Sequence, residues 1–339
     1  MEFNSTDNYF SPSVAVPAIP TTPQDATNIV LRIQEQIRKV FIGQEQVVEQ
    51  ILCALLAGGH VLLEGVPGLG KTLLAKALAQ ACSCHSSRIQ FTPDLMPADV
   101  TGHMFYDMKA SEFVVRRGPV FTNLMLADEI NRAPAKTQAA LLEVMQEGQV
   151  TIEGETALLS PPFLVIATQN PIEQDGTYAL PEAQLDRFLL HVMFDYPTEQ
   201  EELALVAAST FERVGDRLDV DKIEAVASPE MIVALQKITA CIRVDDSVLN
   251  YALSIVRTTR NWPGISTGAG PRGGIALIRS SRASAILAGR DFVTPDDVKQ
   301  QAIPTLRHRI ALSPDAEIEG LTEEHILNRL LDQIEAPRR

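Results

Sequence analysis

Cysteine is scarce in this sequence: four of its 339 residues are cysteines, too few for a disulfide framework in a chain of this length. No positively charged, apolar signal sequence opens the chain. The longest apolar run, residues 51–63, contains two glycines and a histidine and is too short to span a bilayer. These absences exclude secreted, disulfide-stapled and membrane-spanning classes, and we expect a cytoplasmic globular protein without a membrane span.

Basic side chains are also in short supply. The sequence has 29 Lys and Arg against 43 Asp and Glu, which gives a formal net charge of −14. So acidic a surface repels phosphate backbones, and we therefore expect no nucleic-acid partner. Hydrophobic residues make up 45% of the chain, enough for a sizeable core. The length fits roughly two domains of about 150 residues each.

The pattern of apolar residues divides the chain into three segments. Residues 1–24 contain four prolines and are expected to form a disordered leader. Short apolar runs then alternate with helical stretches, at 60–63, 89–91, 124–127, 163–167 and 189–194. Unbroken apolar strands separated by helices predict a parallel sheet covered on both faces. We expect an α/β domain over 25–215, with a hairpin inserted at 149–159, and an all-helical domain without strands over 216–339.

The strongest motif follows the first apolar run. It matches G-x-x-x-x-G-K-[ST] and consists of Gly65, Val66, Pro67, Gly68, Leu69, Gly70, Lys71 and Thr72, with Leu73 next in the helical stretch that follows. The glycines let backbone N–H groups converge on phosphate oxygens, and the helix N-terminus adds the positive end of its dipole. Lys71 would reach the terminal phosphates, and the Thr72 hydroxyl would ligate Mg²⁺. A P-loop is therefore predicted.

Two strand ends supply what a P-loop needs for hydrolysis. Asp128 and Glu129 end the apolar run 124–127, beside the expected phosphate site. Asp128 would hold Mg²⁺ through water, and Glu129 would polarise the attacking water as general base. The run 163–167 leads to Asn170, whose amide could hold the same water, although asparagine is also a common turn residue at strand ends. These residues predict a hydrolytic nucleotide site.

Taken together, the motifs resemble the AAA+ ATPases of the MoxR group. The resemblance rests on the P-loop and on three further runs: Leu-Ala-Asp-Glu-Ile-Asn-Arg-Ala at 126–133, Ala-Thr-Gln-Asn-Pro at 167–171, and Leu-Pro-Glu-Ala-Gln-Leu-Asp-Arg-Phe at 180–188. It covers about residues 30 to 310. It implies an ATP-binding α/β core, a helical lid and a ring, usually a hexamer. It also implies remodelling of partner proteins, frequently ones with von Willebrand factor A domains.

The resemblance also implies roles for single residues. Asn170 matches sensor 1, and Arg187 matches the arginine finger, which reaches a neighbour's γ-phosphate. From spacing alone, Arg187 could equally be a surface arginine paired with Asp186 or Glu182. Arg272 matches sensor 2 at the start of a lid helix, although Gly270 stands where the family more often has serine. Ile42 and Gly43 match the residues that contact adenine. The stretch 91–121 fits an insert in the second helix, and 149–159 fits the pre-sensor-1 hairpin.

Three functions remain compatible with the P-loop. The first is an ATPase that remodels a protein partner; the magnesium-chelatase ATPase subunit, also partnered by a von Willebrand factor A protein, is a close rival within this class. The second is a nucleic-acid motor. The pore loops of such a motor should be basic, whereas the candidate loops 91–121 and 149–159 carry several carboxylates. The third is a nucleotide-gated binding module, which loss of Glu129 or Arg187 would favour; both are present.

Two smaller features lie outside these motifs. Arg307, His308 and Arg309 form a small basic spot in an acidic chain, and we expect it on a solvated or intersubunit face. His60 lies next to the first predicted strand and is expected to be a hydrogen-bonded structural histidine.

Overall fold

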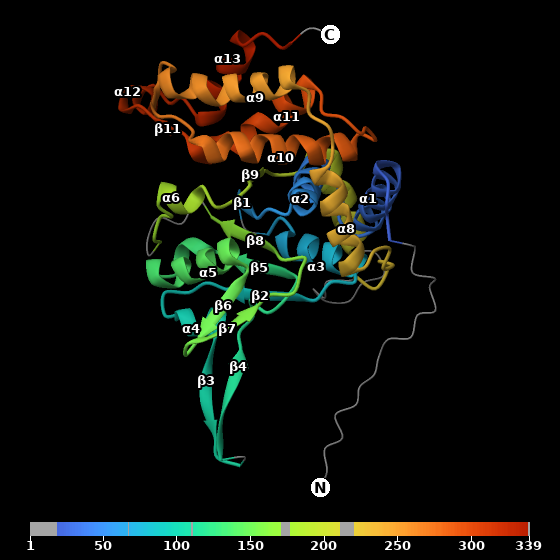
Figure 1. Ribbon diagram of the computed structural model, residues 1–339, viewed down its shortest axis with the longest axis vertical. Helices are drawn as coiled ribbons and strands as arrows, with labels where there is room; N and C mark the ends of the chain where they lie inside the picture. The colour runs from blue at the N-terminus through green and yellow to red at the C-terminus, as the bar shows by residue number, and fades with distance from the viewer. Residues whose placement is uncertain (1–18, 67, 110, 171–176, 211–219, 338–339) are drawn as a thin grey trace.

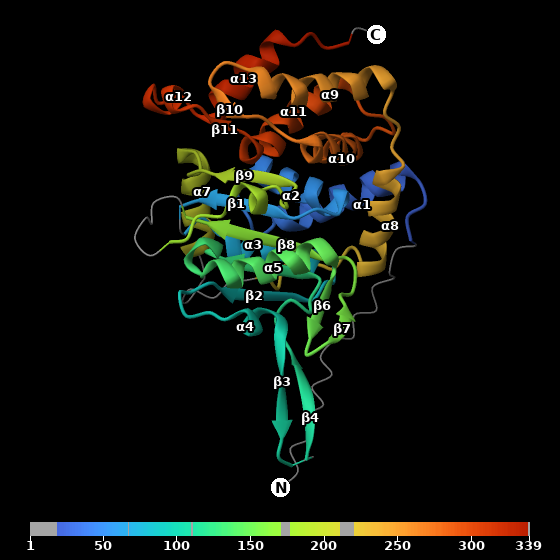
Figure 2. The same cartoon turned by 60° about the vertical axis from the view of Figure 1, so that its left-hand side comes forward.

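The computed structural model describes residues 19–66, 68–109, 111–170, 177–210 and 220–337. A five-stranded sheet, in which all neighbouring strands are parallel, forms its centre (Figure 2). In spatial order its strands are β2 (Ser86–Gln90), β5 (Leu124–Asp128), β8 (Leu164–Gln169), β1 (Val61–Gly65) and β9 (Leu190–Phe194). The predicted parallel sheet is confirmed, and each predicted apolar run contributes to one of its strands.

Helices cover both faces of this sheet. Side chains alternate along the strands, so Leu63 and Leu126 enter one core while Leu62 and Met125 enter the other. The first core also contains α1 (Pro23–Arg38), α2 (Glu45–Ala57) and α3 (Lys71–Ala81). The second contains α5 (Ala135–Glu147) and part of the 3₁₀ turn η1 (Ile130–Arg132). The α/β architecture expected from the sequence is thus confirmed.

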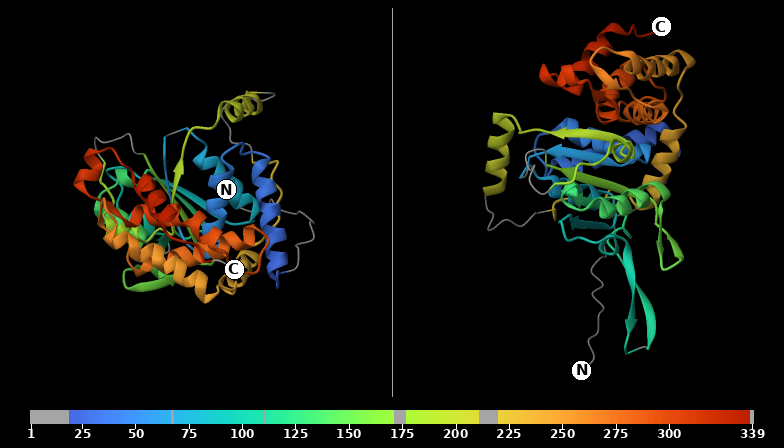
Figure 3. Two further views of the ribbon diagram at one scale, coloured as in Figure 1. Left: turned by 90° about the horizontal axis from the view of Figure 1, so that it is seen from above. Right: turned by 90° about the vertical axis from the view of Figure 1, so that its left-hand side faces the viewer.

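Helix ends follow from local sequence signals. Thr22 caps α1 through a capping box with Asp25, and Gly58 ends α2 in the left-handed conformation at φ 62°. A capping box of Thr198 and Glu201 opens α7 (Glu199–Thr210). Figure 3 shows α7 standing apart from the helices that flank the sheet. Residues 1–18 of the predicted leader and the predicted domain boundary near residue 215 lie outside the described residues, whereas Pro23 and Gln24, which the leader prediction included, belong to α1.

Above the sheet lies a helical lid (Figure 1). Its helices are α9 (Asp246–Thr258), α10 (Pro271–Leu287), α11 (Pro295–Leu306), α12 (Pro314–Ile318) and α13 (Glu323–Gln333), with 3₁₀ turns η2 (Thr259–Asn261) and η3 (Arg307–Arg309). The helical lid is confirmed. In one detail it differs from the sequence expectation, because β10 (Ile265–Thr267) and β11 (Ala311–Leu312) form a short antiparallel pair. Strands of three and two residues are too short to show an alternating pattern.

The remaining helices connect these parts. Helix α8 (Pro229–Ala240) begins at the cap Ser228 and packs against α2, where the Gln236 side chain donates to the Leu55 carbonyl at 2.8 Å. The short helix α6 (Glu182–Leu185) immediately precedes β9. Within the described ranges, no helix has the length and apolarity needed to cross a membrane.

Two hairpins extend from the α/β core. The predicted hairpin at 149–159 is confirmed as β6 (Gln149–Ile152) and β7 (Glu155–Leu158). A longer hairpin, β3 (Gly102–Asp107) with β4 (Glu112–Arg117), follows the short helix α4 (Pro97–Thr101) within the stretch 91–121. Figures 1 and 2 both show β3–β4 projecting away from the body, on the side opposite the lid.

Candidate nucleotide site and arginine cluster

The predicted P-loop connects β1 to α3 at the carboxyl edge of the sheet. Gly68 and Gly70 have φ values of 89° and 86°, a region that glycine enters without the strain of a side chain. Gly65 is required for a different reason: a Cβ atom there would lie 2.2 Å from the carbonyl oxygen of Phe194 in β9. Pro67 lies outside the described residues. The loop therefore has the backbone freedom that phosphate binding demands.

Lys71 begins α3 and is the charged residue of this loop. It is 9% exposed, and its Nζ donates to the Gly65 carbonyl at 2.5 Å. Burial lowers the pKa of Lys71, while the nearby carboxylates of Asp128, Glu129 and Glu64 oppose that shift. An ammonium at a helix N-terminus, facing carboxylates, is the arrangement expected where a phosphate and a metal ion meet.

Asp128 lies at the carboxyl end of β5, and its two oxygens accept from different strands. Thr168 of β8 donates its hydroxyl to Oδ1 at 2.6 Å, and Arg88 of β2 donates from Nη2 to Oδ2 at 2.7 Å. The Asp128 side chain is 17% exposed. Because both contacts come from neighbouring strands, the carboxylate has a fixed orientation at the edge of the sheet.

Glu129 follows in a left-handed conformation, φ 55°, which is uncommon for a residue with a side chain. Its N–H donates to the Thr168 hydroxyl at 2.8 Å, which anchors this backbone. The carboxylate Oε2 accepts from Gln90 of β2 at 2.7 Å and from Arg132 at 3.0 Å. A strained backbone that aims a carboxylate at the phosphate edge is consistent with a catalytic role.

Asn170 directly follows β8, the strand between β5 and β1, and is 7% exposed. It therefore belongs to the same edge as the P-loop. Sequence reasoning missed three residues here: Thr168, Arg88 and Gln90. Thr168 lies in the same run as Asn170, so the run that predicts Asn170 also contains it. The sequence predicts strand β2 from the apolar run 89–91, which begins after Arg88. That run therefore does not show that Arg88 and Gln90 lie on the same face of the strand.

The donor set fits Mg²⁺ and ATP. Thr72 lies in the first turn of α3, which follows β1, and Asp128 lies at the end of β5 on the same edge of the sheet, with β8 between the two strands. In the part of the chain that the structure describes, no group of three or more His, Cys, Asp or Glu could hold a metal. Mg²⁺ at phosphate sites takes one or two carboxylates and completes its shell with phosphate and water, so one carboxylate and one hydroxyl suffice. The residues present therefore fit the ion.

The predicted adenine contacts lie beside the loop. Ile42 and Gly43 line a cavity of about 210 Å³ between α1 and α2, together with Gln34, Arg38, Phe41, Glu45 and Val48. The Phe41 ring stacks on Phe194 at 6.2 Å and lies 3.4 Å from where a Cβ of Gly70 would be. Apolar side chains (Phe41, Ile42 and Val48) together with polar ones (Gln34, Arg38 and Glu45) line this cavity, a combination that suits a flat base with hydrogen-bonding edges.

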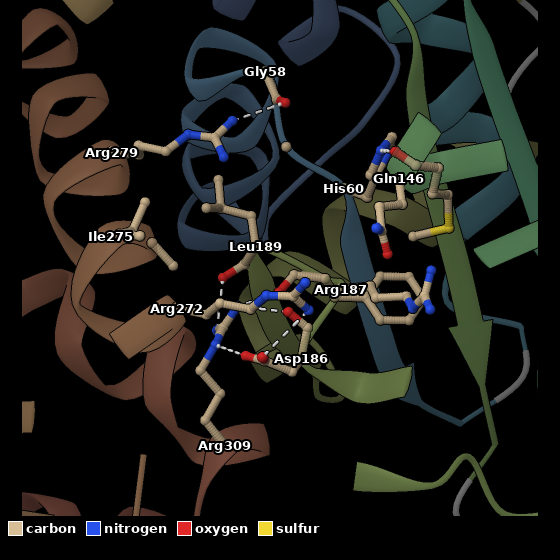
Figure 4. Close-up of a pocket in the computed structure, with 14 residues that line it drawn as sticks. Gly58, His60, Gln146, Asp186, Arg187, Leu189, Arg272, Ile275, Arg279 and Arg309 are labelled. Atoms are coloured by element: carbon tan, nitrogen blue, oxygen red, sulfur yellow. Dashed lines mark hydrogen bonds and ion pairs between the residues drawn. The ribbon is translucent and has the colours of Figure 1, made fainter. Parts of the chain in front are cut away.

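Arg187 and Arg272 lie at the opposite, amino edge of the sheet. Both line a cavity of about 320 Å³ between the core and the lid (Figure 4). The cavity is also lined by residues 58–60, which precede β1, and by residues 188–189, which precede β9. The P-loop follows β1, so the length of that strand separates the two arginines from Lys71. The structure therefore places the predicted site residues in two groups.

The arginines of this cavity have distinct contacts. Arg187 donates from Nη1 to the Leu142 carbonyl of α5 at 2.9 Å. Arg272 lies 3.7 Å from the Asp186 carboxylate, with 60% of its side chain exposed. Arg279, from the same helix as Arg272, donates to the Gly58 carbonyl at 3.0 Å. In the described residues, Asp186 contacts Arg272 and Arg309 of the lid, and no ion pair joins Arg187 to Asp186 or Glu182, so the surface pairing considered from the sequence is not what forms.

One expectation about this region was wrong. The Arg307, His308 and Arg309 spot is not a solvated face, because the Arg309 side chain is 4% exposed and His308 is 7% exposed. Arg309 pairs with Asp186 at 2.7 Å, an acid 123 positions earlier in the chain. The expectation for His60 is confirmed: its Nδ1 accepts from the Val165 N–H, and its Nε2 donates to the Met145 carbonyl, both at 3.0 Å.

Comparisons with known proteins agree with this geometry. A model of the ATPase family associated with various cellular activities (AAA) matches residues 60–190, and a model of the AAA lid domain matches 257–330. The chain is 44% identical to the uncharacterized protein YeaC of Bacillus subtilis, over 93% of this chain and 97% of that protein. It is 41% identical to Chaperone MoxR1 of Mycobacterium tuberculosis, over 89% of this chain and 81% of that protein.

Two further comparisons concern a solved structure and a more distant relative. A crystal structure from Cytophaga hutchinsonii, described as a putative ATPase, superposes with a TM-score of 0.86 at 38% identity and covers 93% of this chain and 97% of its own. The magnesium-chelatase 38 kDa subunit of Acidiphilium rubrum is more distant, with 28% identity over 61% of this chain and 58% of that protein.

Proposed function

The chain belongs to the MoxR group of AAA+ ATPases, and on that premise we propose that it hydrolyses ATP with Mg²⁺ at sites shared between neighbouring subunits of a ring. In each site one subunit supplies the P-loop, Asp128, Glu129 and Asn170. The adjacent subunit supplies Arg187 and Arg272. ATP hydrolysis then drives a change in a bound partner protein.

The binding half of the site is the carboxyl edge of the sheet. The loop 65–72 cradles the phosphates, and Lys71 leaves its Gly65 carbonyl partner to contact them. Thr72 and Asp128 would hold Mg²⁺, which would neutralise phosphate charge there. Glu129 takes the proton of the attacking water, and Asn170 orients that water. For this, Glu129 exchanges its hydrogen bonds to Gln90 and Arg132 for one to the water.

The observation that carries the shared site is the placement of Arg187 and Arg272. A guanidinium stabilises phosphoryl transfer only within hydrogen-bond distance of the phosphate. Strand β1 has five residues, and at roughly 3.3 Å per residue it separates the two edges by about 15 Å. Arg187 therefore cannot serve the P-loop of its own chain without a rearrangement of the sheet, and Arg272 cannot do so without a movement of the lid, whereas a neighbour's P-loop can approach both from outside.

Partner contact is proposed for the β3–β4 hairpin. Four large apolar side chains are exposed on it: Phe105, Tyr106, Met108 and Phe113. Tyr106 and Phe113 pack edge to face with ring centroids 5.2 Å apart. A projecting hairpin with an exposed aromatic pair suits contact with another protein. We propose a ring of six subunits and a partner with a von Willebrand factor A domain, on the resemblance to the family.

ATP turnover by the purified protein tests the enzymatic half of this proposal. Wild type should release phosphate in the presence of Mg²⁺, and Glu129→Gln should still bind ATP while its kcat falls about 10²–10⁴-fold. The matched control is Glu35→Gln, an exposed carboxylate on α1, which should retain wild-type turnover. Equal rates for Glu129→Gln and wild type would assign the general base to another residue.

The partner half is tested with the same variant. Glu129→Gln held in ATP should retain its protein partner, which mass spectrometry then identifies, and Phe113→Ser should reduce that retention. A magnesium-chelatase-like subunit remains the alternative, because it would share this nucleotide site. Recovery of chelatase components would favour that alternative. The cytoplasmic location stays a prediction from the sequence.

A further inference from the structure

The 3₁₀ turn η3 of the lid inserts its side chains into the junction between α6 and β9. Arg309 is the centre of this contact, with its side chain 4% exposed. Its guanidinium donates to a carboxylate and to successive main-chain carbonyls of the core: Asp186 Oδ1 at 2.7 Å, the Asp186 carbonyl at 3.3 Å, the Phe188 carbonyl at 2.6 Å and the Leu189 carbonyl at 3.2 Å. These acceptors lie on both sides of Arg187 in the sequence.

His308 adds a second contact from the same turn. Its Nε2 lies 3.1 Å from the Phe188 carbonyl, and burial together with the Arg309 charge lowers the pKa of His308 well below its usual value. The neutral ring therefore fits between the lid and the core without adding a charge. Two adjacent lid residues thus hold the segment 186–189, which contains Arg187, at three of its four positions.

The same histidine links this turn to the P-loop strand. The His308 ring lies edge to face with His191 of β9, with centroids 5.8 Å apart. His191 in turn contacts the Glu64 carboxylate at 2.8 Å. Glu64 directly precedes Gly65, the first residue of the P-loop. The contacts between the lid and segment 186–189 are therefore continuous with the nucleotide-binding strand of the same subunit.

We propose that Arg309 and His308 are positioning residues for Arg187: the lid holds segment 186–189 so that the Arg187 guanidinium is presented to the neighbouring subunit. The inference rests on the proposed function, because it requires that Arg187 acts on a neighbour's ATP. Arg309 has no contact with the P-loop of its own chain in the described residues. Its effect on hydrolysis is therefore exerted through Arg187.

The chemistry of Arg309 makes a conservative substitution informative. The planar guanidinium has five donors in a fixed fork, which matches a carboxylate and a series of carbonyls around one segment. A lysine keeps the charge that faces Asp186 but cannot reach these acceptors together. Arg309→Lys should therefore preserve the ion pair and release the carbonyls of residues 188 and 189, so that Arg187 loses its fixed position.

The lid offers a matched control. Arg290 forms a similar two-pronged contact with the Asp297 carboxylate, with both N–O distances 2.6 Å, but entirely within the lid. Asp297 is 2% exposed. Arg290→Lys therefore perturbs an arginine paired with a buried carboxylate in the same domain, although the Arg290 side chain itself is 28% exposed, without touching segment 186–189.

The experiment is a complementation test in mixed oligomers, which a merely structural role would not reproduce. Arg309→Lys alone should bind ATP with wild-type affinity and hydrolyse it about 100-fold more slowly, as expected for a misplaced catalytic group. Mixed with Glu129→Gln, which carries an intact Arg187, it should regain activity. Mixed with Arg187→Ala, it should regain none, because neither subunit then presents a working arginine. Arg290→Lys should retain wild-type turnover.

Other outcomes overturn the inference. Recovery in the Arg309→Lys and Arg187→Ala mixture would show that Arg309 serves its own P-loop, and wild-type turnover of Arg309→Lys would show that the contact is dispensable. If Arg309→Lys does not fold, Asp186→Asn, which removes the charge facing Arg309, is placed in the same mixtures and decides by the same criteria. Wild-type turnover of Arg187→Ala would instead refute the proposed shared site, and the positioning role with it.

Discussion

The two edges of the central sheet differ in charge and in how their side chains are held. The carboxyl edge carries the P-loop with Lys71 and the carboxylates Asp128 and Glu129, which pair with Arg88 and Arg132. The amino edge carries four arginines around Asp186, namely Arg187, Arg272, Arg279 and Arg309. One edge has what nucleotide binding and water activation need, and the other has an excess of guanidinium groups. Under the proposed function, the two edges of neighbouring subunits together form one hydrolytic site.

The two edges also differ in which part of the protein holds their functional side chains in place. At the carboxyl edge, neighbouring strands of the same sheet orient the reactive groups, as Thr168 does for Asp128 and Glu129. At the amino edge, a separate domain, the lid, contacts the segment that carries Arg187. The binding half is therefore fixed by the core, whereas the arginine half depends on where the lid sits. Under the proposed shared site, a change in the position of one subunit's lid therefore alters the active site of its neighbour.

The largest effect is expected at the amino edge. Arg187→Ala should lower kcat about 10³-fold or more, the scale of a lost arginine finger, while the affinity for ATP stays at the wild-type value. Steady-state turnover and calorimetric titration with ATP measure the two quantities. Arg32→Ala, an exposed arginine on α1, serves as the control and should change neither. A weakened ATP affinity in Arg187→Ala would mean that the two edges are not separable in this way.

The carboxyl edge should show the reverse pattern. Lys71→Ala removes the ammonium that faces the phosphates and should weaken ATP binding about 10–100-fold, the range of a charge-assisted hydrogen bond. Lys76→Ala changes an exposed lysine of the same helix and should bind ATP as wild type does. Calorimetric titration compares the two, and equal affinities for all three proteins would contradict the P-loop assignment.

Thr168→Val tests whether hydrogen bonds within the core orient Asp128 and Glu129 at the carboxyl edge. Valine keeps the shape of threonine but leaves the Asp128 Oδ1 and the Glu129 N–H without their shared hydroxyl partner. The free energy of unfolding should fall by about 1–3 kcal/mol, the cost of buried unpaired polar groups, and kcat should fall with it. Denaturant unfolding and turnover measure this. Thr151→Val, on the exposed β6–β7 hairpin, should alter neither.

The smallest effect concerns His60 at the amino edge. Burial lowers the pKa of His60 to about 4, against about 6.5 in the unfolded chain, so the folded form binds its proton less readily. The stability that His60 contributes is complete above pH 6.5 and is lost as the pH falls toward 4. At pH 5.5 the loss should be about 1 kcal/mol. Denaturant unfolding of wild type and His60→Gln between pH 7 and 5 should show a shallower pH dependence in the variant.

Sequence reasoning was most successful where the information is local. The runs 124–127 and 163–167 form β5 and β8, and Gly68 and Gly70 of the P-loop adopt the left-handed conformations that the motif requires. The lid strands and β2 were harder to predict. The lid strands have three and two residues, which is too short for a pattern. Ser86–Gln90 contains a single apolar residue and so does not form a continuous apolar run.

Long-range pairing explains most of what was missed. The contacts of Arg88 and Thr168 with Asp128 depend on the strand order β2-β5-β8, which a single sequence does not specify. The burial of Arg309 depends on Asp186, which is 123 residues away in the chain. The triplet 307–309 taken by itself therefore predicts a basic spot on the surface. The roles of Arg187 and Arg272 came from the family resemblance, and their separation from the P-loop became evident only from the positions of β1 and β9.

The most direct test of the shared site is ATP turnover in mixtures of Arg187→Ala and Glu129→Gln subunits. Each variant alone should be nearly inactive, since every interface lacks one of the two groups. In mixed oligomers, some interfaces pair an intact Glu129 from one chain with an intact Arg187 from the other, so the mixture should regain activity that rises with protein concentration. If sedimentation shows mixed oligomers and turnover stays at the level of the single variants, the two edges do not form one site between subunits.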